Sequence, residues 1–529
     1  MTPENVIVTT ACLSSPLNNY SEDEAMRFLS KAKEHFGDNF YIEVQPHTNI
    51  KQVEFQKKIL KYNREFGFPL ILGVDSHYIK LEDDKTRDLF LKGKNIHYPA
   101  EDGFTMDYPD ITDIVKRLKL QGVLTDAQIE EAITNTLVAR DFEGVSLNKE
   151  IKMPSLYSGK SHEEKIKILK ALINEKWEED RKEIPEEKWG EYIEAIREEI
   201  EIIEETRMED YFLLNHAIIE KAVSEYGGVI TSTGRGSAPS FYINKLLGLT
   251  DIDRVSAPIT LYPTRFMSKS RILETRSLPD IDFNLADPEP FRKASKDLMG
   301  NDNSEWMVAY GTMQEPSAFK NYARSVGIDY NEANQVSDDL DRYKNDKRWS
   351  EVIKASSVFR GVIDSVAPHP CAHLLLPRAN TSETTGTIKV KDEFVTLITS
   401  NESDDYKYLK NDLLSVTVWD IISKTYDMIG KPRHTIRELE RVVEGDDNVW
   451  KLYRDGIVAT LNQTGTKSGK PQVMQYKPTS VGELSMWVAS IRPGFASLKQ
   501  EFFNRKEHKY GIDSLDAVLS ETNGYMIFQ

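Results

Sequence analysis

The sequence predicts a multidomain protein of the mixed α/β class. The chain has 529 residues, which is too long for one hydrophobic core, because a single domain usually holds about 100–200 residues. Near the N-terminus, apolar runs of strand length such as V-I-V-T-T-A-C-L and P-L-I-L-G-V-D alternate with stretches that space their apolar residues like a helix. Hydrophobic residues make up 39% of the chain and charged residues 29%, which is ordinary for a soluble protein.

The predicted elements change character along the chain. The pattern indicates strands alternating with helices in 1–80 and mostly helix in 110–225. A strand is predicted over 226–233, which leads through G-R-G-S into the apolar helix F-Y-I-N-K-L-L-G. Polar helices are predicted in 314–365, strands in 370–420, and helices in 418–529 with a break at I-R-P-G. The dense glutamates of 163–210 predict a solvated helical face.

Composition argues against several classes of protein. No run approaches the roughly 18 apolar residues that a membrane helix needs, and the N-terminus lacks the pattern of a signal peptide. The two cysteines, Cys12 and Cys371, give no disulfide framework, so we expect a cytoplasmic location. The net charge of -17 by itself argues against a nucleic-acid-binding protein. However, residues 467–509 carry eight Lys or Arg against three Glu, and such a local surface can bind a phosphate backbone.

Two aspartates stand one residue apart in the apolar run L-P-D-I-D-F-N. If this run is a strand, Asp280 and Asp282 point to one face, about 6.5–7 Å apart along the chain, while Ile281 and Phe283 enter the core. Two converging carboxylates repel unless a cation lies between them, and Mg²⁺ prefers such oxygen ligands. Two exposed acids on an edge strand are the alternative interpretation.

A glycine-rich turn precedes the aspartates in V-I-T-S-T-G-R-G-S. Gly234 and Gly236 would let backbone N–H groups approach an anion closely. Arg235 and Ser237 offer side-chain donors, and the N-terminus of the following helix would add a favourable dipole. An ordinary strand-to-helix turn explains the pattern equally well.

A further carboxylate comes from the strand-like run Y-L-K-N-D-L-L-S-V. Lys410 and Asp412 would share one face of this strand. A third acid would complete a site for two metal ions, and the lysine could meet a triphosphate. A simple surface Lys–Asp pair is the alternative.

Taken in order, these motifs resemble the bacterial replicative DNA polymerase III alpha subunit, a C-family DNA polymerase. The matching segments are G-R-G-S-A-P-S-F-Y-I-N-K-L-L-G-L-T-D-I-D, R-F-M-S, L-P-D-I-D-F-N, Y-G-T-M, the Asp412 segment, I-R-P-G, N-R-K and L-S-E-T-N-G-Y-M-I-F-Q. Three more, V-T-T-A-C-L, Y-I-E-V-Q-P-H and G-V-D-S-H-Y, resemble the later part of that family's polymerase-and-histidinol-phosphatase (PHP) domain. The resemblance spans essentially the whole chain.

The resemblance implies a template-dependent DNA polymerase that adds dNTPs to a primer 3′-hydroxyl. Asp280, Asp282 and Asp412 would hold two Mg²⁺ ions. The residues that would bind the nucleotide are Gly234, Arg235, Gly236, Ser237, Lys410, Arg492, Arg505 and Lys506. Primer–template DNA would be bound through its backbone and shape, because base pairing supplies the sequence information.

The resemblance also implies an order of domains. These are a partial PHP-type α/β barrel in 1–155, a nucleotidyltransferase-like mixed α/β palm in 156–310 and 369–417, a helical thumb in 311–368, and incomplete helical fingers in 418–529. The chain would be the middle piece of a larger polymerase, encoded in pieces or by a phage, with partner polypeptides at both ends. A sliding clamp would bind only through further C-terminal parts.

Some residues depart from the family pattern. In the PHP-like part only Cys12, Asp75 and His77 match metal ligands, so we expect a packed cysteine, a hydrogen-bonded Asp–His pair and no Zn²⁺. Asn284 and Asn411 stand where an acid and an aromatic residue are usual. In A-P-H-P-C-A-H-L, the histidines and the cysteine are too closely spaced for a usual zinc site, so we expect them to pack.

Two other functions stay open. The chain could be a non-catalytic subunit that needs partner chains to complete the polymerase. It could also be a metal-dependent phosphoesterase that uses Cys12, Asp75 and His77, although most ligands of such a site are missing.

Overall fold

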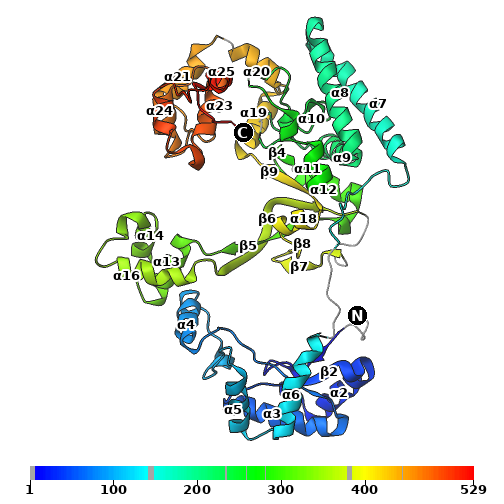
Figure 1. Cartoon of the computed structure of the whole chain (residues 1–529), viewed down its shortest axis with the longest axis vertical. Helices are drawn as coiled ribbons and strands as arrows, with labels where there is room; N and C mark the ends of the chain where they lie inside the picture. The colour runs from blue at the N-terminus through cyan, green and yellow to red at the C-terminus, as the bar shows by residue number, and fades with distance from the viewer. Residues whose placement is uncertain are drawn as a thin grey trace. The chain divides into compact units, whose positions relative to one another are not determined.

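The computed structural model describes residues 6–140, 148–232, 235–257, 259–279, 281–377, 384–443 and 445–528, in two compact units (Figure 1). The first unit combines residues 1–146 with the segment 311–365. The second combines residues 147–310 with 366–529. The predicted mixed α/β, multidomain class is confirmed, and each unit is described by itself below.

The N-terminal part of the first unit contains a parallel sheet of three strands in the order β1-β2-β3. Parallel neighbours need a crossover, and helices supply it between successive strands. The elements are β1 (Val8–Thr9), α1 (Pro16–Asn19), α2 (Glu22–Phe36), β2 (Phe40–Val44), α3 (Ile50–Phe66), β3 (Leu70–Leu72), α4 (Asp84–Gly93), α5 (Ile111–Gln121) and α6 (Asp126–Asn135). The strand and helix alternation predicted for residues 1–80 is confirmed, whereas a partial barrel stays a prediction.

The segment 311–365 of the first unit is helical, as predicted. Its helices are α13 (Glu315–Ser325), α14 (Tyr330–Ser337), α15 (Leu340–Tyr343) and α16 (Ser350–Ser356), around a core that includes Phe319 and Trp349. Helix α4 packs closely on α13, because Gly93 leaves no room for a side chain beside Asn321, and the Arg324 guanidinium donates to the Gly93 carbonyl at 2.9 Å. This contact explains why 311–365 forms one unit with the N-terminal part.

The second unit is built on a mixed sheet of six strands in the order β4-β9-β6-β5-β8-β7 (Figure 1). The strands are β4 (Ile281–Leu285), β5 (Ser304–Thr312), β6 (Ile363–Leu375), β7 (Thr387–Val390), β8 (Glu393–Thr396) and β9 (Leu409–Ser415). β4 is parallel to β9, and β9 is antiparallel to β6. The strands predicted in 370–420 are therefore present, and β9 lies between β4 and β6.

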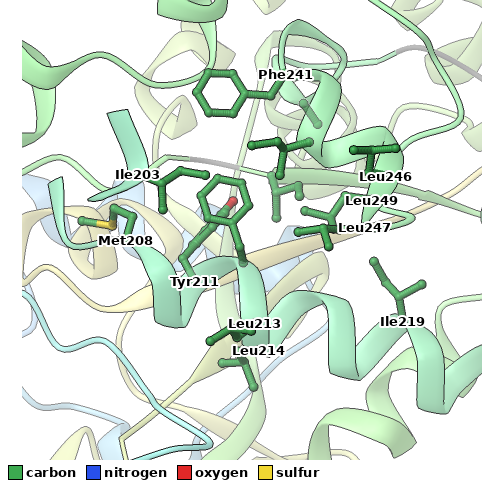
Figure 2. Close-up of a cluster of buried hydrophobic side chains, with 14 of the residues drawn as sticks. Ile203, Met208, Tyr211, Leu213, Leu214, Ile219, Phe241, Leu246, Leu247 and Leu249 are labelled. Atoms are coloured by element: carbon green, nitrogen blue, oxygen red, sulfur yellow. The ribbon is translucent and has the colours of Figure 1, made fainter. Parts of the chain in front are cut away.

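Helices pack one face of this sheet into a large core. The helices before β5 are α7 (His162–Asp180), α8 (Trp189–Thr206), α9 (Glu209–Tyr226), α10 (Tyr242–Leu246), α11 (Lys269–Thr275) and α12 (Glu289–Met299). Figure 2 shows Ile203, Tyr211 and Phe241 of this core, which also takes Phe283 from β4 and Leu413 from β9. This packing fixes the position and orientation of β4 and β9 in the sheet.

The strand predicted over 226–233 is wrong in extent. Helix α9 continues to Tyr226 and ends at Gly227, which adopts the left-handed conformation with φ +67°. Within the described residues, only a short antiparallel pairing follows, with a bridge between Ile230 and Leu285 and a Thr231 N to Asn284 O bond of 2.8 Å. The run is too short to extend a strand, but it attaches the glycine turn to β4.

The C-terminal part of the second unit is helical, as predicted. Its helices after β9 are α19 (Thr417–Ile429), α20 (Ile436–Val443), α21 (Asp447–Asp455), α22 (Gly469–Tyr476), α23 (Val481–Ser490), α24 (Lys499–Phe503) and α25 (Asp513–Val518). The short helix α18 (Ser400–Asp405) precedes β9 and was not predicted, because it lies in the range predicted as strands. Helix α23 ends just before I-R-P-G, where the sequence predicts a break. Trp487, Phe502 and Tyr525 lie in a separate hydrophobic core. Throughout the described residues, every helix is too short or too polar to cross a lipid bilayer.

Candidate functional site

Asp282 and Asp412 are direct partners on neighbouring parallel strands. β4 and β9 pair in a register that sets Asp282 beside Asp412, and adjacent strands lie about 4.8 Å apart. Ile281 and Phe283 are buried on the other face, each 1% exposed, so both aspartates stand on the opposite face of the sheet. The two carboxylates can therefore share one cation. Asp280 lies outside the described residues.

The glycine turn reaches the carboxylate of Asp282. From the Ile230–Leu285 bridge the chain runs antiparallel to β4, which leads it back toward Asp282. A side chain added at Gly236 would place its Cβ 2.0 Å from Asp282 Oδ2, and Gly236 has a φ of +72°. Glycine is therefore required twice here, for space and for the backbone conformation. Arg235 is exposed beside it and Ser237 is half-buried, whereas Gly234 lies outside the described residues.

The sequence predicts that the N-terminus of the helix after this turn helps to bind an anion, and this prediction is wrong. The first amides of α10, those of Tyr242 and Ile243, donate to the two oxygens of Glu199 at 2.8 Å each. Glu199 comes from α8, is fully buried and also accepts from Arg254 Nε at 2.5 Å. Burial raises the pKa of Glu199 to about 7, which Arg254 and the two amides oppose. This internal carboxylate occupies the place of the anion, so the α10 amides are not free for a ligand.

Lys410 lies beside Asp412, as the strand periodicity predicts. The Lys410 ammonium is 3.7 Å from Asp412 Oδ2 and 3.7 Å from Asp404 Oδ1, and its side chain is 7% exposed. Asp404 belongs to α18 and was not predicted from the sequence. Its position at the end of a capped helix just before β9 is the only local signal that could have found it.

Cys371 on β6 lies beside the paired aspartates. The imidazole Nδ1 of His369 accepts from the backbone N–H groups of Cys371 and Ala372, at 3.3 and 2.8 Å. Cys371 Sγ lies 4.0 Å from Asp412 Oδ1. Burial, Asp412 and Asp282 raise the pKa of Cys371 to about 11, so the thiol stays protonated at neutral pH. The thiol thus packs beside the carboxylates as an uncharged group.

Two buried polar residues support the strands from behind. His373 on β6 is fully buried against Trp306, with ring centroids 5.1 Å apart, in agreement with the predicted packing. Asn411 lies between Lys410 and Asp412 but points to the other face, where its amide donates to Asn215 of α9 at 2.8 Å. These contacts fix β6 and β9 without taking part in the aspartate pair.

The basic residues of the C-terminal helices differ in how they are engaged. The Arg505 guanidinium donates to both oxygens of Glu483, at 2.8 and 3.0 Å, and lies 4.1 Å over the Tyr476 ring. Lys506 pairs with Glu501 at 2.8 Å, and Arg492 is exposed. All three side chains are exposed, and Arg505 is the one held by both an ion pair and a ring contact.

The three PHP-like residues belong to the first unit. His77 Nε2 lies 3.4 Å from Asp75 Oδ1, and Arg87 Nη2 lies 3.0 Å from the other ring nitrogen. Because the arginine donates, that nitrogen accepts, and both nitrogens of His77 are engaged within the protein. Cys12 is half-buried. Within the part of the chain that the structure describes, no group of three or more His, Cys, Asp or Glu is arranged to hold a metal ion.

Comparison with known proteins identifies the family. Residues 167–415 match the model of the bacterial DNA polymerase III alpha NTPase domain, and residues 419–529 match that of the bacterial DNA polymerase III alpha subunit finger domain. The first match contains both paired aspartates and ends with β9. The chain belongs to the bacterial DNA polymerase III alpha subunit family, as the sequence motifs predict.

Several curated relatives align with nearly the whole chain. DNA polymerase III subunit alpha of Aquifex aeolicus is 22% identical over 99% of this chain and 50% of its own length. The Campylobacter jejuni protein of the same name is 24% identical over 99% of this chain and 48% of its length. The DNA-directed DNA polymerase of Bacillus phage SPbeta is 22% identical over 93% of this chain and 44% of its length. The chain thus spans about half the length of these relatives.

Proposed function

We propose that this chain is the catalytic core of a DNA-directed DNA polymerase, which adds nucleotides from dNTPs to the 3′-hydroxyl of a primer on a DNA template. The register pairing of Asp282 with Asp412 carries this proposal. It supplies two carboxylates on one sheet face, next to a glycine turn and a lysine, in a chain of the DNA polymerase III alpha family.

The donor set fits magnesium. Carboxylate oxygens are the ligands that Mg²⁺ prefers, and the missing Cβ of Gly236 leaves space at the Asp282 carboxylate. Asp282 and Asp412 would hold the ions, with Asp280 as a third ligand inferred from its place in the sequence. When bound, Mg²⁺ would neutralise phosphate charge and make the primer hydroxyl more acidic.

The other residues would bind the nucleotide and the DNA. Lys410, held in place by Asp404 and Asp412, would set a positive charge next to the triphosphate. Gly236 and the exposed Arg235 would present backbone and side-chain donors to the phosphates. Arg492, Arg505 and Lys506 would contribute from the finger helices, and Arg505 would first have to leave Glu483.

The domain roles follow from the same proposal. The palm would consist of residues 156–310 and 369–417, and the thumb of residues 311–368. Part of the fingers would be formed by residues 418–529. A PHP-like domain would be formed by residues 1–155, and its helix α4 would pack against the thumb. Partner polypeptides would supply the remaining parts of the polymerase.

Primer extension tests this function. The chain, alone and with the products of adjacent genes, is assayed with Mg²⁺, dNTPs and a primer–template, next to Asp412→Asn and Asp420→Asn. Asp420 lies on α19 and pairs with Lys424 at 2.6 Å, so it is a matched control away from the paired aspartates. We expect extension by the unchanged chain and by Asp420→Asn, and none by Asp412→Asn, with similar DNA affinities. Equal extension by all three, or none by any, would count against the proposal.

A further inference from the structure

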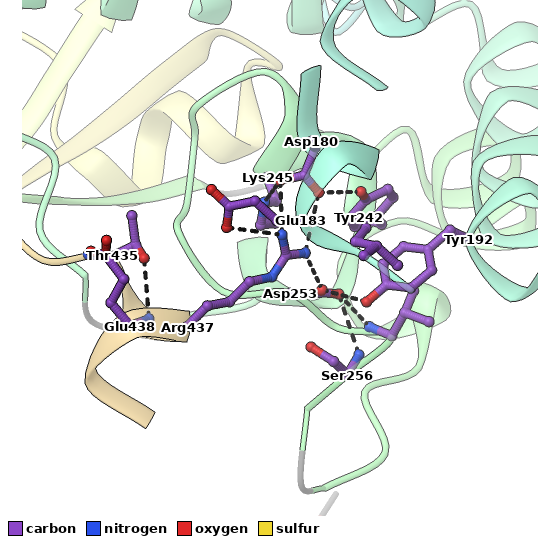
Figure 3. Close-up of polar contacts among 12 residues, drawn as sticks. Asp180, Glu183, Tyr192, Tyr242, Lys245, Asp253, Ser256, Thr435, Arg437 and Glu438 are labelled. Carbon is purple, nitrogen blue, oxygen red and sulfur yellow. Dashed lines mark hydrogen bonds and ion pairs between the residues drawn. The ribbon is translucent and has the colours of Figure 1, made fainter. Parts of the chain in front are cut away.

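A cluster of charged side chains joins three segments of the second unit (Figure 3). Asp180 lies at the end of α7, Lys245 on α10 and Arg437 on α20, and Asp253 lies in the loop that follows α10. The side chains of Arg437, Asp180 and Asp253 are 16%, 17% and 6% exposed. Charges with so little exposure are stable only when they are paired, so the arrangement is specific.

Asp180 holds α10 by two contacts. Its carboxylate accepts from the Tyr242 hydroxyl at 2.5 Å and pairs with the Lys245 ammonium. A carboxylate at the C-terminal end of a helix is disfavoured by the helix dipole, so these donors compensate for its position. Burial raises the pKa of Asp180, but Lys245, Tyr242 and Arg437 outweigh burial and leave the pKa below its ordinary value.

Arg437 reaches from the finger helix α20 to two of these acids. Its guanidinium donates to both oxygens of Asp180 at 3.2 Å and to Asp253 Oδ2 at 2.8 Å. Asp253 also accepts from the Tyr192 hydroxyl at 2.7 Å. The planar fork of arginine allows one side chain to bridge two carboxylates, which the single ammonium of lysine cannot do with the same geometry.

The hydrophobic cores before and after α20 are separate. The core that contains β4 and α10 and the core that contains Trp487 share no residue within the described ranges. Beside Arg437, a cavity of about 520 Å³ is lined both by Lys188 and Tyr192 and by Trp450 and Val481. Of the ion pairs between described residues, those of Arg437 alone join the segment 419–529 to residues 147–310.

We propose that Arg437 is a positioning residue, which couples the finger helix α20 through Asp180 to α10, the first α-helix after the glycine turn. The proposal rests on the proposed function for its kinetic consequence, but the coupling itself is a property of the fold. A nucleotide that contacts both the glycine turn and the fingers would be bound by two segments whose relative position is fixed by Arg437. Arg437 touches neither the paired aspartates nor their neighbours and would act only through α10 and α20.

Hydrogen exchange tests the coupling without any activity. The full chain is compared with Arg437→Gln, Arg437→Lys and Arg454→Gln. Arg454 pairs with Asp447 at 2.5 Å within α21 and so matches Arg437 in residue type and segment. We expect Arg437→Gln to speed exchange of α10 and α20 amides roughly tenfold, Arg437→Lys to speed it less, and Arg454→Gln to leave it unchanged. Unchanged exchange in α10 would overturn the proposal, as would equal effects of Arg454→Gln.

Nucleotide kinetics then separate positioning from general stability. We expect Arg437→Gln to raise the KM for dNTP roughly tenfold with kcat within about threefold, and Arg437→Lys to restore part of the loss. An unchanged KM would overturn the role in nucleotide binding. If Arg437→Gln does not fold, Asp253→Asn, which leaves Asp180 in place, is expected to give the same shift at smaller size, and no shift would overturn the proposal. If the unchanged chain incorporates no nucleotide, the proposed function fails, while the exchange data still decide on the coupling.

Discussion

Asp282 and Asp412 occupy directly paired positions on β4 and β9, although a large part of the chain separates them in the sequence. The pairing is parallel, so it depends on the helices and strands that lie between the two segments and not on a local turn. Gly236 lies against the carboxylate of Asp282, and Lys410 lies beside Asp412. Each of these residues makes a separate prediction.

Gly236→Ala is expected to abolish nucleotide incorporation while the protein stays folded. The added Cβ would lie 2.0 Å from Asp282 Oδ2, and the φ of +72° would add strain of about 1 kcal/mol. The displaced carboxylate could no longer share a cation with Asp412. Primer extension and circular dichroism measure the two effects. Gly159→Ala is the control, since nothing lies within 4 Å of its Cβ position; retained activity in Gly236→Ala would show that the turn can move away.

Lys410→Gln is expected to raise the KM for dNTP roughly tenfold with little effect on DNA affinity. The ammonium lies 3.7 Å from Asp412 and carries the only positive charge that an ion pair sets beside that carboxylate among the described residues. Steady-state incorporation at several dNTP concentrations measures the change. Lys424→Gln, which removes an exposed pair on α19, serves as the comparison. A change in kcat alone would indicate that Lys410 acts on the aspartates and not on the nucleotide.

His373→Phe is expected to make the free energy of unfolding fall less between neutral pH and mild acid than it does in the unchanged protein. Burial lowers the pKa of His373 to about 3, while the unfolded chain takes up the proton near pH 6.5. The neutral histidine therefore stabilises the fold above pH 6.5, and this contribution falls by about 1.4 kcal/mol per pH unit as the pH drops toward 3. Urea unfolding at pH 7.5 and 5.5 measures it. Identical pH dependence in the variant would mean that other groups control acid stability.

Arg505 and Arg492 are expected to differ in what their loss changes. Arg505→Gln removes a two-oxygen ion pair with Glu483 and a ring contact with Tyr476, and should lower the free energy of unfolding by about 1–2 kcal/mol, because both contacts are partly screened by solvent. Arg492→Gln removes an exposed side chain and should leave stability within about 0.5 kcal/mol. Its effect is expected in the KM for dNTP instead. Thermal unfolding paired with kinetics distinguishes the two, and equal destabilisation would contradict the assignment.

The sequence predicts the faces of the strands better than their neighbours. The alternation of Ile281, Asp282 and Phe283 predicts which side chains are buried, because strand periodicity is local. It does not predict that Asp412 becomes the partner of Asp282, since pairing between distant segments depends on the whole fold. The strand predicted over 226–233 is wrong in extent for the same reason, because among the described residues it pairs with β4 only through the Ile230–Leu285 bridge and its neighbouring bonds.

Single buried charges are the hardest features to find in the sequence. Glu199 stands in R-E-E-I-E-I-I-E-E-T among glutamates that face solvent, yet it caps α10. Its spacing from Ala195 and Ile203, four residues to either side, places it on the buried face of α8 and is the one signal available. Arg437 carries no such signal, because its partners come from segments far away in the chain.

Iron-directed cleavage tests the central claim most directly. Fe²⁺ bound in place of Mg²⁺, with ascorbate and peroxide, cuts the backbone close to the metal, and mass spectrometry locates the cuts. Because Asp282 and Asp412 are register partners, we predict cuts in both β4 and β9 that excess Mg²⁺ suppresses, and loss of both sets in Asp412→Asn. Cuts near Asp282 that persist unchanged in Asp412→Asn, or no cuts in either strand, would contradict a shared metal site.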